Sequence, residues 1–119
     1  MASIWDNEMN IFEQRKRVMK HIYEARQLLG GDLPRIDVKI LELKPDQLGF
    51  GYKNTIEISH ECRHWREDVL RLVVWHELAH AWFSSPHDED CLLMRSRTDT
   101  SAYYKREKLE AALLRVARN

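Results

Sequence analysis

The chain has 119 residues, of which 44% are hydrophobic and 32% charged, so we expect one domain that is large enough to bury a core. Nineteen basic and nineteen acidic residues give no net charge, which argues against strong electrostatic attraction to nucleic acid or to an anionic membrane. No apolar run is long enough to span a bilayer and the first eight residues lack the pattern of a signal peptide, so a cytoplasmic location is favoured.

Hydrophobic periodicity predicts an α+β domain with the order helix, three strands, long helix, loop, helix. Apolar residues recur at helical spacing before Gly30 and Gly31, a pair that is typical of a helix end. The second and third strands are expected to pair as a hairpin around a tight turn at residues 53–54. The predicted elements are helix 4–29, strands 35–43, 48–52 and 55–58, helix 65–83 and helix 101–118.

The most informative segment is His-Glu-Leu-Ala-His at residues 76–80, inside the predicted helix 65–83. Residues four apart lie one above the other on a helix, so His76 and His80 can bind the same Zn²⁺ ion. Glu77 lies next to the first ligand, where its carboxylate can take a proton from a water that the metal activates. Random ordering of this composition would give the pattern only about 0.02 times, so chance is a poor explanation.

The same pattern occurs a second time at residues 60–64, as His-Glu-Cys-Arg-His. This copy lies where the third predicted strand ends and the next helix begins, and charged residues follow it. It has no apolar frame to hold metal ligands in place. We therefore interpret His60 and His64 as residues of a solvated helix start.

A catalytic zinc site needs a third protein ligand and an open fourth position. His87 is the preferred candidate, because it follows the predicted helix end by a few residues and the chain can fold back under the metal. Glu110 on the last helix is a second candidate, although a salt bridge to Arg106 is its expected structural role. The remaining candidates are Asp88, Asp90, Asp99 and, through sulfur, Cys91.

At these residues the chain resembles a compact metzincin-like zinc metallopeptidase of the zincin superfamily. His-Glu-Leu-x-His is followed by His87 seven residues on, and then by Leu-Met-Arg-Ser at 93–96, in which Met94 matches the methionine of the Met-turn. The resemblance covers about residues 55–104 and departs from the family pattern at Phe83, where metzincins have a glycine. Without that glycine, the active-site helix is expected to end one step later.

The resemblance implies a minimal zincin-like domain, in which a small twisted sheet covers the active-site helix. His76, His80 and His87 would hold Zn²⁺, and Glu77 would be the general base of a zinc-dependent endopeptidase. Tyr103 or Tyr104 lies where such domains often have a tyrosine, and would donate a hydrogen bond to the oxyanion.

The expected partner is a peptide or protein substrate, bound by strand addition along the third strand or the hairpin edge. No nucleic acid and no membrane span are expected. Two further functions stay open, namely a catalytically silent zincin-fold binding or adaptor module and a nucleic-acid-associated protease similar to the SprT or WLM proteins.

The remaining conspicuous residues are given structural roles. Cys62 and Cys91 are interpreted as free thiols, because two cysteines are too few for a disulfide scaffold. The basic side chains of the first helix are interpreted as solvated surface, namely Arg15, Lys16, Arg17 and Lys20.

Overall fold

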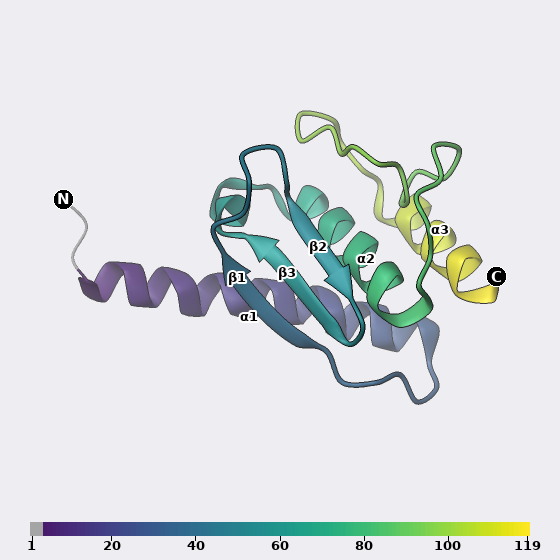
Figure 1. The fold of residues 1–119 in the computed structure, drawn as a ribbon, viewed down its shortest axis with the longest axis horizontal. Helices are drawn as coiled ribbons and strands as arrows, with labels where there is room; N and C mark the ends of the chain where they lie inside the picture. The colour runs from purple at the N-terminus through teal and green to yellow at the C-terminus, as the bar shows by residue number, and fades with distance from the viewer. Residues whose placement is uncertain (1–3) are drawn as a thin grey trace.

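A computed structural model describes residues 4–119, with side chains from residue 11 onward. The prediction of no signal peptide rests partly on residues 1–3, which lie outside the described residues. The elements are α1 (Ile4–Leu29), β1 (Asp37–Leu41), β2 (Gly49–Tyr52), β3 (Thr55–Ser59), the 3₁₀-helix η1 (His60–His64), α2 (Glu67–Phe83) and α3 (Arg106–Arg118). Helices α1 and α2 lie behind the sheet in Figure 1, and α3 packs on α2. The α+β class is therefore confirmed. No helix in the described part of the chain is long and apolar enough to cross a membrane.

The three strands form one mixed sheet in the order β1-β3-β2. Strands β2 and β3 form the predicted antiparallel hairpin, whose turn contains Asn54 at φ 59°, a left-handed conformation that asparagine tolerates. Strand β3 also pairs in parallel with β1, with Val38 opposite Ile56. Because β3 is paired on both sides, the predicted addition of a peptide to the third strand is wrong, and β2 remains as the free edge of the hairpin.

Alternation along the strands decides which face of the sheet is buried. Ile56 and Ile58 of β3 are fully buried, and they lie opposite Gly51 and Gly49 of β2 on the same face. Helix α2 packs against this face and is buried over most of its surface, with Trp75 fully inaccessible to solvent. The helix that carries His76 and His80 is therefore closely packed by the rest of the domain.

The ends of several elements differ from the prediction. Strand β1 is shorter than residues 35–43, and α3 begins at Arg106 rather than at residue 101. The reason at α3 is a turn held by Asp99, whose carboxylate accepts hydrogen bonds from the N–H and hydroxyl of Ser101. The N–H of Tyr104 donates to the Asp68 carboxylate at 2.9 Å, which keeps the chain extended along α2 before α3 starts.

The prediction of solvated surface is wrong for Arg17, whose side chain is only 26% exposed, whereas Arg15 is exposed as predicted and still contacts the sheet. Arg15 donates to the carbonyl of Val38 at 2.8 Å, while Arg17 donates to the Glu67 carboxylate at 2.5 Å and to the Cys62 carbonyl at 3.0 Å. A long guanidinium side chain can satisfy carbonyls at the ends of neighbouring elements. These contacts fasten α1 to β1, η1 and α2.

Candidate metal centre

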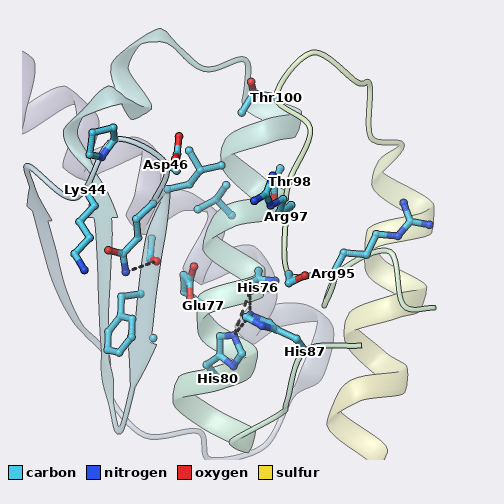
Figure 2. Close-up of a pocket in the computed structure, with 18 residues that line it drawn as sticks. Lys44, Asp46, His76, Glu77, His80, His87, Arg95, Arg97, Thr98 and Thr100 are labelled. Carbon is cyan, nitrogen blue, oxygen red and sulfur yellow. Dashed lines mark hydrogen bonds between the residues drawn. The ribbon is translucent and has the colours of Figure 1, made fainter. Parts of the chain in front are cut away.

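Three histidines converge beside the second half of α2. His76 and His80 lie one turn apart on the helix, and His87 lies in the loop that follows it. The Nε2 atom of His76 is 3.1 Å from that of His80 and 3.3 Å from that of His87, and the last two Nε2 atoms are 3.2 Å apart. Figure 2 shows the three rings gathered at one point. The structure thus brings together the three predicted ligands, in a group that could hold a metal ion.

Two backbone carbonyls set the orientation of the helix histidines. Nδ1 of His76 lies 2.6 Å from the carbonyl oxygen of Leu93, and Nδ1 of His80 lies 2.6 Å from that of Ser85. A carbonyl can only accept, so each Nδ1 carries a proton and each Nε2 of a neutral ring presents a lone pair. Two such lone pairs 3.1 Å apart cannot hydrogen-bond to each other, whereas a cation between them satisfies both.

Burial keeps these rings in the form that binds metals. Desolvation lowers the pKa of His76 to about 4, and it also lowers the pKa of His80 below its ordinary value. Both rings are therefore neutral at pH 7, which metal ligation requires. In a tetrahedral site with metal–nitrogen bonds of about 2.0–2.1 Å, the ligand nitrogens lie about 3.3 Å apart. The separations of 3.1–3.3 Å fit such a site with one corner left for water or substrate.

The end of α2 explains how His87 reaches the other two ligands. The helix ends at Phe83, and Ser84 adopts a left-handed conformation at φ 50° while its N–H donates to the carbonyl of His80. A residue at this position normally is glycine, because a Cβ atom is unfavourable there. The helix thus ends one residue beyond the point where a metzincin glycine would turn the chain, as predicted from Phe83.

The loop that carries His87 is closed on itself by a backbone hydrogen bond. The N–H of Asp88 donates to the carbonyl of Met94 at 2.8 Å, and the Met94 side chain is buried. The carbonyl of the preceding residue, Leu93, is the one that holds His76. Residues 93–94 therefore fix both a ligand on the helix and the residue next to the ligand in the loop.

Glu77 is buried between α2 and β2 and is 6% exposed. This burial raises the pKa of its carboxyl group to about 8, because the charged form loses hydration. A Cβ atom on Gly49 would lie 2.8 Å from Oε2 of Glu77, and one on Gly51 would lie 2.3 Å from the Glu77 backbone oxygen. Only glycine at these two positions lets β2 pack so closely on the side chain and the backbone of Glu77.

A cavity of about 1130 Å³ opens in front of Glu77 and the three histidines. Residues 44–51, including part of β2, form one wall, and residues 95–98 with Thr100 form the other. Figure 2 shows Lys44 and Asp46 on the first side, Arg97 on the second, and Glu77 with the histidines between them. The volume lies slightly above the usual range for sites that bind small ligands, about 300–1,000 Å³.

The two candidate tyrosines do not line this cavity. Tyr103 is 74% exposed, and the hydroxyl of Tyr104 donates to the carbonyl of Asp99 at 2.7 Å. The structure therefore brings neither of them to the histidines, and the oxyanion role stays a prediction.

The carboxylates considered as third ligands are engaged elsewhere. Glu110 lies 3.9 Å from Arg106 in the predicted salt bridge, and Asp99 holds the turn before α3. The Asp88 carboxylate accepts a hydrogen bond from the N–H of Asp90 within their own loop. None of these carboxylates belongs to the metal-ligand group found among residues 4–119.

The other copy of the motif and the cysteines behave as the sequence predicts. His60 and His64 belong to η1, where the His60 ring lies 3.7 Å from Glu61 and Nε2 of His64 accepts a hydrogen bond from Arg63 at 3.1 Å. Cys62 and Cys91 are free thiols, and burial raises the pKa of Cys62 to about 11. A thiol with such a pKa is a weak ligand and nucleophile at pH 7.

Sequence reasoning missed the groups that orient the ligands. The carbonyls of Leu93 and Ser85 carry no signature in residue type, because every residue has a carbonyl group. The close approach of β2 to Glu77 did have a signal, namely two glycines that alternate in one short strand.

Comparisons with protein-family models, curated proteins and solved structures find no match for this chain.

Proposed function

We propose that this chain is a zinc-dependent endopeptidase of the metzincin-like kind, with His76, His80 and His87 as metal ligands. The observation that carries the proposal is the convergence of three Nε2 atoms within 3.3 Å, beside a buried glutamate in one cavity. Three histidines with an open fourth position are a donor set of catalytic zinc sites. Met94, buried directly after the carbonyl that holds His76, supports the likeness to a Met-turn.

A zinc ion held by these residues would activate water and polarise the scissile carbonyl. Glu77 accepts the proton of the attacking water and delivers it to the leaving amine. Without metal its pKa is about 8, and a zinc ion held by the three histidines would favour the charged carboxylate. Glu77 would then be a base at pH 7 rather than a buried neutral acid.

An extended peptide is the substrate that the walls of the cavity suit best. Strand β2 is an edge strand and contributes Gly49, Phe50 and Gly51 to the cavity that contains Glu77. A peptide that adds to this edge forms backbone hydrogen bonds with β2 and runs past the histidines. The reaction is then hydrolysis of a peptide bond of that strand.

The test is the Glu77→Gln variant, assayed for zinc content and for cleavage of a peptide library. Zinc content should stay at one per chain, while the rate should fall by about 10² to 10⁴, which is the usual contribution of a general base. Glu61→Gln is the matched control, because it changes the same position of the other motif copy and should leave both values unchanged. Retained turnover in Glu77→Gln would remove Glu77 from the mechanism.

The wild type itself separates the competing functions. Zinc binding with no cleavage of any library peptide would favour a silent binding or adaptor module. Binding to DNA that weakens steeply with salt would favour a nucleic-acid-associated protease.

A further inference from the structure

The face of β2 that points away from α2 carries two exposed aromatic residues. Phe50 is 49% exposed and Tyr52 is 37% exposed, and their ring centroids lie 5.5 Å apart. The Tyr52 hydroxyl donates to Glu57 of β3 at 2.9 Å, which holds the tyrosine flat along the sheet. Figure 1 shows the helices on the other side of the sheet, so within the described residues no helix covers this face.

The hydrogen-bond register shows which backbone groups of β2 face its free edge. The N–H of Ser59 donates to the carbonyl of Leu48, so Leu48 directs its backbone groups toward β3. Backbone groups alternate between the two sides along a strand, so those of Phe50 and Tyr52 also face β3. Those of Gly49 and Gly51 therefore point outward. The Gly49 carbonyl accepts a 3.4 Å hydrogen bond from the Gln47 side chain, which a pairing peptide would replace.

This register fixes where the side chains of a peptide paired along β2 would lie. Residues opposite Gly49 and Gly51 would project toward α2, on the face that carries Glu77. The residue between them, opposite Phe50, would project to the open face and lie about 4.5–5.5 Å from it between Cβ atoms. Phe50 is also one of the residues that line the cavity with the histidines, so a peptide that pairs with β2 there passes this residue.

We propose that Phe50 and Tyr52 form a specificity surface that selects extended peptides with a large apolar side chain opposite Phe50. This inference rests on the proposed peptidase function, and it names the substrate class of that site. An apolar side chain there covers two aromatic rings that otherwise face water, whereas a charged one would lose hydration against them. Selection is expected at every second residue, because only alternate side chains of a strand reach the open face.

The test measures binding separately from turnover. Two labelled eight-residue peptides share a serine and threonine background and carry either phenylalanine or lysine at alternate positions. Their affinities are measured by fluorescence anisotropy with zinc-loaded Glu77→Gln protein, and again after Phe50→Ser or Phe50→Leu is added. Phe12→Ser is the matched control, since Phe12 is 59% exposed but lies on α1.

We expect the phenylalanine peptide to bind about five- to tenfold more tightly than the lysine peptide, as cross-strand aromatic contacts of this size predict. Phe50→Ser should abolish that preference, Phe50→Leu should restore most of it, and Phe12→Ser should leave it intact. Equal affinity for both peptides, or a preference that survives Phe50→Ser, would overturn the inference.

Cleavage of the same peptides by the wild type distinguishes this inference from the proposed function. Turnover without preference between the peptides would leave the peptidase standing and remove the specificity surface. A binding preference that depends on Phe50, without any turnover, would leave the surface standing and count against the peptidase.

Discussion

His60 and His64 have the same His-Glu-x-x-His spacing as His76 and His80, but the two pairs lie in different kinds of helix. The first pair belongs to the 3₁₀-helix η1 and the second to the α-helix α2. With three residues per turn, side chains four apart point about 120° away from each other, whereas in an α-helix they differ by about 40°. The same spacing therefore gives a shared ligand position only in α2.

The surroundings widen this difference. The His64 side chain is 64% exposed, whereas His76 is 8% exposed and held by a carbonyl. The chain leaves η1 extended at Trp65, with φ −89° and ψ 144°, but it reverses after α2 at Ser84 and returns with His87. A metal site thus needs helical geometry, anchored rings and a returning loop in addition to the motif.

The largest effect on stability is expected at Gly51, where β2 packs against Glu77 of the His-Glu-x-x-His motif in α2. In Gly51→Ala, the new Cβ atom would lie 2.3 Å from the backbone oxygen of Glu77, so strand or helix must move. We expect a loss of about 3 kcal/mol in the free energy of unfolding, near the upper end for overpacking. Urea denaturation measures it, with Gly30→Ala as the control, because its Cβ meets nothing and costs only about 1 kcal/mol for its positive φ. A loss at Gly51 no larger than at Gly30 would contradict the close packing.

A smaller effect is expected from the buried carboxyl group of Glu77 in α2. In the metal-free protein, burial raises the pKa of Glu77 from 4.5 to about 8, so between these values the folded chain holds a proton that the unfolded chain releases. Stability therefore falls as pH rises through this window, and Glu77→Gln removes that fall. In the presence of a chelator, the free energy of unfolding of Glu77→Gln should exceed that of the wild type by on the order of 2 kcal/mol at pH 8. The excess should be much smaller at pH 5.

Glu61→Gln is the control for this experiment, because Glu61 is the exposed glutamate of the first motif. Its unfolding free energy should stay within about 0.5 kcal/mol of the wild type at both pH values. A difference between wild type and Glu77→Gln that does not grow with pH would show that Glu77 is not desolvated.

The smallest effect is expected at Ser84, in the turn that ends α2 after the His-Glu-x-x-His motif. Ser84 adopts φ 50°, where glycine has no Cβ penalty, so Ser84→Gly should raise the free energy of unfolding by about 0.5–1 kcal/mol. Zinc binding should be retained, because the turn that brings back His87 is kept. Thermal denaturation of the metal-free variant measures the gain, and a loss of stability would argue against the left-handed turn.

Much of this arrangement could be predicted because it depends on residue type and spacing. Helical periodicity placed α1 correctly, and the alternation of residues 48–58 placed the hairpin of β2 and β3. The apolar frame of residues 69–83 separated His76 and His80 from the exposed copy of the motif. The distance of His87 from the helix end was enough to indicate a returning loop.

The rest could not be predicted because it depends on tertiary contacts. The parallel pairing that makes β3 central joins segments far apart in the chain, and no local pattern reports it. The contacts of Arg17 with η1 and α2 and the late start of α3 arise from hydrogen bonds to groups elsewhere in the fold. The exposure of Tyr103 likewise follows from the extended chain before α3, which helical periodicity had included in the helix.

The most direct test of the central claim is the zinc content per chain, measured by elemental analysis of protein purified without chelators. We predict one zinc in the wild type and in the His64→Ala and Glu110→Ala variants, and a loss of zinc in His80→Ala and His87→Ala. Zinc that survives His87→Ala but is lost in Glu110→Ala or His64→Ala would contradict the three-histidine site.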